Sequence, residues 1–270
     1  MRVFLLFVAV MLHAESLRVV SYNVRYPAKG DGANVWEARK DLFVASVKAM
    51  DPDVMGTQEL FKLQGDYLVE RAPEYKWFGV SRRGNSEDEH MGVFYKPAKL
   101  RVVESGNYWL SETPETVGSS SWDMSLPRMV TWAVFESKAT KKRFFFANTH
   151  FPHRGQQDAK ARLECAKVIA ARLAKVKAGL PVILTGDFNA GADTDVHQLL
   201  TQTLEDAWEK APQRFGPEQT FHGFTGKTDG RRIDWILTRG WKALVAQTGD
   251  LNSGGRYPSD HFPVLALLAL

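Results

Sequence analysis

Short runs of β-branched and aromatic residues recur along the chain and are bounded mostly by Gly, Pro, Asn, Asp or Ser. Runs of this length and composition predict β-strands. The predicted strands cover residues 17–24, 52–59, 90–96, 99–110, 129–137, 142–151, 180–189, 232–238, 243–251 and 262–270. Two longer stretches, 34–50 and 156–179, have apolar residues at helical spacing and predict amphipathic helices. This mixture indicates an α/β fold with helices packed outside the sheets.

The first residues follow a different pattern, in which Arg2 precedes an apolar run that ends near Ala14. This is the outline of a secretory signal peptide, and the run is too short to span a bilayer comfortably. We expect residues 1–14 to be a signal peptide, with an uncleaved anchor as the less favoured alternative. Because no Pro-rich, Gly/Ser-rich or single-charge block divides the rest, we expect residues 15–270 to form a single domain. We expect the mature protein to be exported, periplasmic or secreted, without a stable membrane span, and we expect it to be a monomer.

Composition narrows the chemistry. The chain has 270 residues, a formal net charge of +4 and one cysteine, Cys165. One cysteine excludes an intrachain disulfide and argues against a Cys-based zinc site, so we expect Cys165 to be a buried structural thiol. The mild positive charge is compatible with anionic substrates but lacks the basic stripe of a dedicated nucleic-acid binder.

Polar side chains stand on or beside six of the predicted strands, mostly where a strand ends. They are Asn23, Glu59, His150, Asp187, Asn189, Asp234, Asp260 and His261. One such residue is ordinary, because strand ends must meet water, but six strands with the same feature suggest a common site. Buried carboxylates need a cation or a donor beside them, and a metal is a partner that all of them can share.

The types of side chain in this set indicate which metal is expected. Five of them offer oxygen ligands: Asn23, Glu59, Asp187, Asn189 and Asp260. Oxygen ligands favour a hard cation, Mg²⁺ or Mn²⁺, over zinc or copper. Because Mg²⁺ held by one or two carboxylates typically serves phosphate substrates, phosphoryl chemistry is the leading class.

The histidines fit the same chemistry, since phosphoester hydrolysis needs a positioned water and positive charge near the phosphoryl oxygens. His261 can contact or protonate a phosphoryl oxygen, and Asp234 can fix its tautomer. His150, at the end of an aromatic strand, can supply a second donor.

Six motifs occur in the order "SYNVR", "GTQE", "NTHF", "TGDFN", "RIDWIL" and "YPSDHFPV". In combination they resemble the deoxyribonuclease I-like endonuclease/exonuclease/phosphatase superfamily over essentially the whole mature chain. The loops are most similar to its secreted bacterial branch, which is distantly related to the deadenylases. The resemblance implies a four-layer α/β/β/α sandwich of two mixed β-sheets flanked by helices, with the site at one edge of the sheets.

The resemblance also implies roles for the oxygen ligands. Asn23, Glu59 and Asp260 match residues beside the metal. Asp187 matches the residue that orients or activates the attacking water, and Asn189 matches a contact to phosphate or the transition state.

It implies roles for the remaining polar residues as well. His261 matches the catalytic histidine whose partner is Asp234, and His150 matches a second histidine that faces phosphate. Similarity to deoxyribonuclease I nominates Glu89 as the carboxylate partner of His150.

Two long loops supply candidate substrate contacts. Arg128 can fork onto a phosphate, since guanidinium suits bidentate contact with oxyanions. His153 and Arg154 follow His150 closely and are either substrate contacts or part of a solvated loop. Trp122 is either a stacking platform or a packing residue.

We therefore expect a Mg²⁺- or Mn²⁺-dependent phosphoric ester hydrolase. Its substrate would be a phosphomonoester or phosphodiester of a sugar, inositol or lipid headgroup, cleaved by in-line attack of water. The main alternative is a nuclease that acts on a nucleic-acid end, including a 3′–5′ RNA exonuclease of the deadenylase kind, or a DNA endonuclease. A minor alternative is an inactive binding protein on the same fold.

Overall fold

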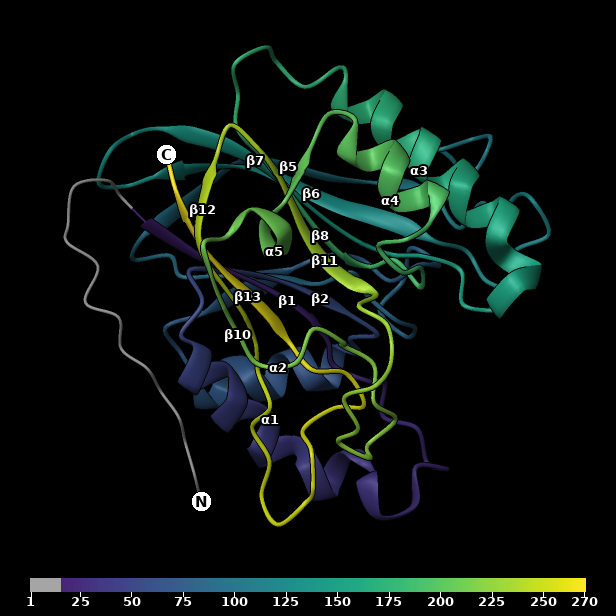
Figure 1. The fold of residues 1–270 in the computed structure, drawn as a ribbon, viewed down its shortest axis with the longest axis vertical. Coiled ribbons are helices and arrows are strands. Elements are labelled where there is room, and N and C mark those ends of the chain that lie inside the picture. Colours follow the sequence, from purple (N-terminus) through teal and green to yellow (C-terminus); the bar gives the residue numbers. More distant parts are fainter. Residues whose placement is uncertain (1–15) are drawn as a thin grey trace.

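The computed structural model describes residues 16–270, so the predicted signal peptide at 1–14 lies outside the described residues. Two mixed β-sheets lie face to face between two layers of helices (Figure 1). This confirms the four-layer α/β/β/α sandwich that the family resemblance implied. None of the helices within residues 16–270 has the length and apolar character needed to cross a membrane.

The first sheet has seven strands in the order β10-β12-β13-β1-β2-β4-β3. In it β1 runs parallel to β2 and antiparallel to β13. Its strands are β1 (Ser16–Asn23), β2 (Val54–Gln58), β3 (Lys76–Phe78), β4 (Val93–Tyr95), β10 (Gln213–Phe215), β12 (Lys242–Thr248) and β13 (Val264–Ala269).

The second sheet has six strands in the order β5-β6-β7-β8-β11-β9. Here β7 and β8 are parallel, and β11 is antiparallel to β8. Its strands are β5 (Leu100–Trp109), β6 (Met129–Ser137), β7 (Arg143–His150), β8 (Val182–Asp187), β9 (Glu205–Asp206) and β11 (Asp234–Arg239).

Alternating side chains of β1 explain why the sheet is covered on both faces. Leu17 and Val19 belong to the core between the sheets, where they meet side chains such as Phe146 of the second sheet. Val20 and Tyr22 point the other way, into the core beneath the outer helices. Because successive strand residues face opposite sides of the sheet, a strand that is apolar on both faces must be covered on both faces.

Helices cover the two outer faces, with α1 and α2 on one side and α3 and α4 on the other (Figure 1). Cys165 is buried on α3, as predicted for a structural thiol. The helices are α1 (Trp36–Met50), α2 (Lys62–Arg71), α3 (Ala159–Leu173), α4 (Asp195–Thr201), α5 (Ala207–Lys210) and the short 3₁₀ turns η1 (Gly32–Asn34) and η2 (Gly155–Asp158). The strands β3, β9 and β10, of two or three residues each, were not predicted because such short segments carry no readable periodicity. The strand β4 is as short, but it lies within the run predicted at 90–96.

Candidate active site

Three adjacent strands of the second sheet place site residues in one row. The strand register pairs His150 with Asp187 across β7 and β8, and Asp187 with Asp234 across β8 and β11. His150 and Asp187 end their strands, and Asp234 begins an antiparallel one. All three therefore stand at the same edge of the sheet.

The first sheet brings its own residues to this edge. Asn23 ends β1 opposite the last residue of β2, so Glu59 follows directly beside it. Asp260 and His261 precede β13, which is antiparallel to β1. The hydroxyl of Ser259 donates to the carbonyl oxygen of Asn23 at 2.7 Å and holds this turn against β1.

The Asn23 side chain links the two sheets. Its amide nitrogen donates to Glu59 Oε1 at 3.1 Å and to Asp187 Oδ2 at 3.0 Å. Its oxygen accepts the backbone N–H of Arg25 at 3.0 Å. The amide of Asn23 thus positions two carboxylates, and its predicted role beside the metal stays a prediction, because an amide oxygen that accepts one N–H keeps a second lone pair.

Glu59 and Asp260 form a pair of carboxylates at this edge. Glu59 has a positive φ of 58°, and its Oε2 accepts the backbone N–H of Tyr26 at 3.1 Å. Burial raises the pKa of Asp260, and the charge of Glu59 adds to that effect while His261 and two arginines oppose it. In the described chain the cationic nitrogens nearest to the pair belong to Arg25, at 3.9 and 3.8 Å. Two carboxylates of like charge at one edge fit a divalent hard cation.

Asp187 is the buried carboxylate at the centre. Its Oδ1 accepts the backbone N–H of Asn189 at 2.9 Å, and its Oδ2 lies 3.5 Å from His150 Nε2 and 3.7 Å from His261 Nε2. Burial and the charge of Asp234 raise the pKa of Asp187 to about 7. A carboxyl group that titrates near neutral pH is suited to accept a proton from water.

Asn189 supports this carboxylate through its backbone. It adopts a positive φ of 48°, and its amide nitrogen donates to the carbonyl oxygen of Phe151 at 3.1 Å. A left-handed backbone is uncommon outside glycine, although asparagine tolerates it better than most residues. The predicted phosphate contact of Asn189 stays a prediction.

The two histidines have opposite charge states. Burial opposes the charged form of His261, but the Asp234 and Asp187 carboxylates outweigh it and raise its pKa to about 10. Its Nδ1 lies 2.9 Å from Asp234 Oδ2, the partner that the sequence predicted. Burial holds the pKa of His150 well below its ordinary value, and the nearby Arg128 charge acts in the same direction. The site therefore offers one cationic and one neutral imidazole.

Replacing Asp234 with asparagine is expected to move the alkaline limb of the kcat/KM pH profile to lower pH. The wild-type profile should rise as Asp187 ionises near pH 7 and fall as His261 loses its proton near pH 10. Removing the Asp234 charge removes the strongest effect that favours the imidazolium, so His261 deprotonates earlier. An unchanged alkaline limb would show that Asp234 does not control this proton.

The free energy of unfolding should also fall as pH rises through the pKa of His261. Folding raises the pKa of His261, so its charge contributes stability that is fully present below about pH 6.5, its value in an unfolded chain, and is lost as pH rises through about 10. In Asp234→Asn this loss should begin at lower pH, as measured by denaturant unfolding. Asp193→Asn, which changes an exposed carboxylate paired with Arg231, is the matched control.

The predicted pairing of Glu89 with His150 is wrong. The backbone N–H of Arg82 donates to the carbonyl oxygen of Glu89 at 2.8 Å, which joins the two residues across the loop. Arg82 Nη1 then donates to Glu89 Oε2 at 2.8 Å. The Nδ1 of His150 is buried with no hydrogen-bond partner among residues 16–270. Burial, with a contribution from the charge of Glu59, raises the pKa of Glu89 to about 7.

Two of the predicted substrate contacts meet near His150. Arg128 is 3 % exposed, and its Nη2 lies 2.9 Å from His153 Nδ1. Its Nη1 is buried with no hydrogen-bond partner in the described chain. Burial lowers the pKa of Arg128, and the charges of Glu89 and other carboxylates act against this lowering. Arg128 therefore keeps a donor group that a bound anion can satisfy.

The other two predicted contacts have structural partners. Arg154 holds Asp158 through Nε at 3.1 Å and Nη2 at 2.8 Å, so its fork is already used. Trp122 packs against the core that includes Cys165 and Ile169 of α3. The packing role that the sequence allowed for Trp122 is therefore present, and its role as a stacking platform stays a prediction.

Sequence reasoning missed three residues at the site. Arg25 follows Asn23 directly and approaches both Glu59 and Asp260. Phe221 is 48 % exposed and sets its ring 5.0 Å from that of His261. Arg82, described above, is the third. Arg25 was visible in "SYNVR", whereas Phe221 and Arg82 lie in loops without a readable pattern.

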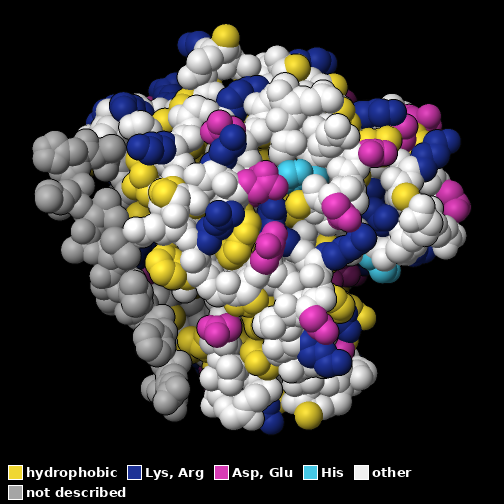
Figure 2. Space-filling model, viewed as in Figure 1, with side chains coloured by type: hydrophobic (Ala, Val, Ile, Leu, Met, Phe, Trp, Pro, Cys, Tyr) yellow, Lys and Arg dark blue, Asp and Glu magenta, His cyan; other side chains and the backbone are white. Residues whose placement is uncertain are grey.

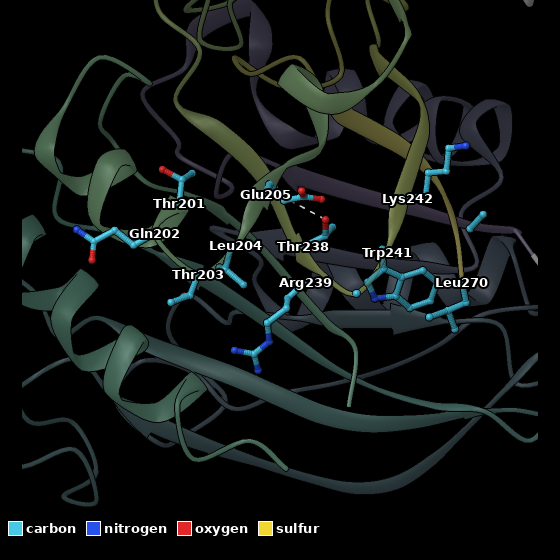
Figure 3. Close-up of a pocket in the computed structure, with 12 residues that line it drawn as sticks. Thr201, Gln202, Thr203, Leu204, Glu205, Thr238, Arg239, Trp241, Lys242 and Leu270 are labelled. Carbon is cyan, nitrogen blue, oxygen red and sulfur yellow. Dashed lines mark hydrogen bonds between the residues drawn. The ribbon is translucent and has the colours of Figure 1, made fainter. Parts of the chain in front are cut away.

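Two other features lie apart from this edge. His197, Asp206 and Glu209 come together, but Arg232 Nη1 neutralises Asp206 at 2.6 Å, so the group forms an ion-pair network. A pocket of about 590 Å³ opens where β11 ends at Arg239, the opposite end of the strand from Asp234 (Figure 3). Its labelled lining is mainly threonine, leucine and long charged side chains, and it includes none of the residues predicted for the site.

Comparison with known proteins finds a matching family and similar solved structures. The model of the endonuclease/exonuclease/phosphatase family matches residues 20–261. A family protein from Bacteroides thetaiotaomicron is 34 % identical with a TM-score of 0.90, and the match covers 96 % of this chain and 99 % of that chain. A mannosyl-6-phosphatase from the same organism is 34 % identical with a TM-score of 0.87, covering 94 % and 100 %. The human nocturnin catalytic domain, at 21 % identity, TM-score 0.74 and 94 % coverage of each chain, shares the fold alone.

Proposed function

The chain belongs to the endonuclease/exonuclease/phosphatase family, and on that premise we propose that it hydrolyses a phosphomonoester of a sugar with the help of Mg²⁺ or Mn²⁺. Members of this family are hydrolases that act on phosphate esters and depend on a divalent metal. The observation that carries the proposal is the buried Asp187 set between a neutral His150 and a cationic His261. This arrangement offers a base and a positive charge to the same reacting group.

The residues have separable tasks in this reaction. Asp187 takes a proton from the water that attacks phosphorus. As the bond from phosphorus to this water forms, the bond to the sugar oxygen on the opposite side breaks, and that oxygen takes a proton from solvent and leaves as the alcohol. His261 donates a charged hydrogen bond to a phosphoryl oxygen, and Asp234 holds its other nitrogen. Glu59 and Asp260 would hold the divalent cation, which would supply positive charge to stabilise the charge that develops on the phosphoryl oxygens.

Several observations support a small sugar phosphate as substrate. The mannosyl-6-phosphatase matches 94 % of the chain at 34 % identity. Buried Arg128, with an unsatisfied Nη1, is suited to a terminal phosphate oxygen. On the face seen in Figure 2, the described basic and acidic side chains are interspersed rather than gathered in a basic stripe. That surface does not favour a long nucleic acid backbone.

A substrate panel tests the proposal. Mannose 6-phosphate, glucose 6-phosphate, an aryl phosphodiester, single-stranded RNA and plasmid DNA are each incubated with the mature chain and Mg²⁺ or Mn²⁺. We expect phosphate release from a hexose 6-phosphate at a kcat/KM at least about a hundredfold above that for the diester. Shortening of the RNA or nicking of the DNA, with no phosphate released from the sugars, would instead establish the nuclease alternative.

A further inference from the structure

Arg25 occupies an unusual position beside the proposed metal carboxylates. Its Nη1 lies 3.9 Å from Glu59 Oε2, and its Nε lies 3.8 Å from Asp260 Oδ2. Both distances are too long for hydrogen bonds, so the guanidinium approaches the carboxylates without bonding to them. A positive charge thus stands next to the two groups that would hold a cation.

Asp31 keeps the guanidinium in that place. Its two oxygens accept from Arg25 Nε at 3.1 Å and from Nη2 at 2.7 Å, a fork on one edge of the group. The side chain of Asp31 is 9 % exposed and that of Arg25 is 25 % exposed. A bidentate pair of this kind has a defined geometry as well as an attraction.

The backbone of Arg25 is fixed as well. Its φ of 55° is left-handed, and its carbonyl oxygen accepts from Arg39 Nη2 at 2.7 Å and from Gln64 Nε2 at 2.9 Å. Arg39 is fully buried. The origin of the side chain is therefore rigid, and only rotation about its own bonds can bring the guanidinium closer to Glu59 and Asp260.

We propose that Arg25 competes with the divalent cation for Glu59 and Asp260, and that Asp31 restrains Arg25 and so sets the metal affinity of the site. This inference rests on the metal dependence in the proposed function. Without the Asp31 fork, a shift of about 1 Å would turn the two long contacts into ion pairs of hydrogen-bond length. The restraint therefore leaves the carboxylates available to a metal while keeping a fixed positive charge beside it.

Metal binding without substrate tests this. Free Mn²⁺ is titrated into the full mature chain and followed by electron paramagnetic resonance, which gives a Kd that does not depend on catalysis. Arg25→Met removes the competing charge and is expected to tighten Mn²⁺ binding about tenfold. Asp31→Asn releases Arg25 and is expected to weaken binding about tenfold by the same reasoning.

Two further variants separate charge from fold. Arg25→Lys keeps the charge and is expected to bind Mn²⁺ no more tightly than wild type. In the double variant Arg25→Met/Asp31→Asn, the Asp31 change should lose most of its effect, because it acts through Arg25. Arg101→Met and Glu136→Gln, which break a 2.9 Å ion pair between β5 and β6, control for net charge.

The outcomes distinguish this inference from the proposed function. Suppose that the wild type binds Mn²⁺ and that Arg25→Met, shown to be folded by circular dichroism, binds it with the same or a higher Kd. This result would overturn the competition between Arg25 and the metal while leaving the proposed metal-dependent hydrolase intact. Equal effects of Asp31→Asn in the presence and absence of Arg25 would also overturn it. No Mn²⁺ binding by the wild type would contradict the metal dependence itself, and this inference with it.

Discussion

Asp187→Asn should lower kcat for sugar phosphate hydrolysis by about 10³- to 10⁴-fold, because asparagine cannot accept the proton of the attacking water. Asp187 is 1 % exposed and is held by Asn189 and Asn23, so the variant keeps nearly the same shape at this position. KM should change much less, because the carboxylate acts on the water rather than on the sugar. Steady-state phosphate release gives both parameters.

The control for this variant is Asp193→Asn, which changes an exposed carboxylate in an ion pair with Arg231. It should keep wild-type kcat. Retention of more than about a tenth of wild-type kcat by a folded Asp187→Asn would show that the base lies elsewhere. Near-ultraviolet circular dichroism establishes that the core around the substituted residue is intact.

His261→Gln should lower kcat/KM by about 10²- to 10³-fold, the usual cost of removing one donor to a developing oxyanion. Glutamine can still donate a hydrogen bond but carries no charge, and the Asp234 and Asp187 carboxylates that raise the pKa of His261 would lose their cation. The alkaline limb of the pH profile should disappear with it. A profile that keeps this limb would assign the titration to another group.

The matched comparison is His150→Gln. Burial keeps the pKa of His150 well below its ordinary value, so its contribution comes from a neutral hydrogen bond. Its loss should cost less than the loss of His261, because hydrogen bonds from charged donors are roughly twice as strong. Equal losses in the two variants would contradict the opposite charge states inferred for these imidazoles.

Much of the site could be predicted because it is tied to strands. Strand ends are readable from apolar runs, and a residue that ends a run must stand at a sheet edge. His150, Asp187 and Asp234 were predicted on three separate strands, and the register places them in one row. The His261–Asp234 contact was predicted from a histidine's need for a carboxylate that fixes its tautomer and from the family resemblance, and it is present at 2.9 Å.

Contacts within loops could not be predicted in the same way. The Glu89–Arg82 ion pair depends on how the chain between β3 and β4 folds back, and no periodicity reports that path. The ion pair between Arg154 and Asp158 could not be predicted, because an aspartate four residues after an arginine is often exposed to solvent instead. Trp122 packs against the core that includes Cys165, and this contact depends on the tertiary fold rather than on any local sequence pattern.

The outline of the fold was more predictable than its details. The two sheets are required by strands such as β1, which is apolar on both faces and must be covered twice. The order of strands in each sheet brings residues 23 and 187 together across the two sheets, and sequence separation alone gives no sign of this. The contact between these two residues joins the polar strand ends of the two sheets into one site.

The central claim is that this edge hydrolyses a phosphate ester with a bound divalent metal. The most direct test follows phosphate release from mannose 6-phosphate by the protein. The rate is measured with Mg²⁺ or Mn²⁺, after removal of the metal with EDTA, and after return of the metal in excess. We predict release with metal, loss of at least about 99 % of the rate in EDTA, and recovery when metal is restored. Undiminished release in EDTA, or no hydrolysis of any phosphoester with either metal, would contradict the account.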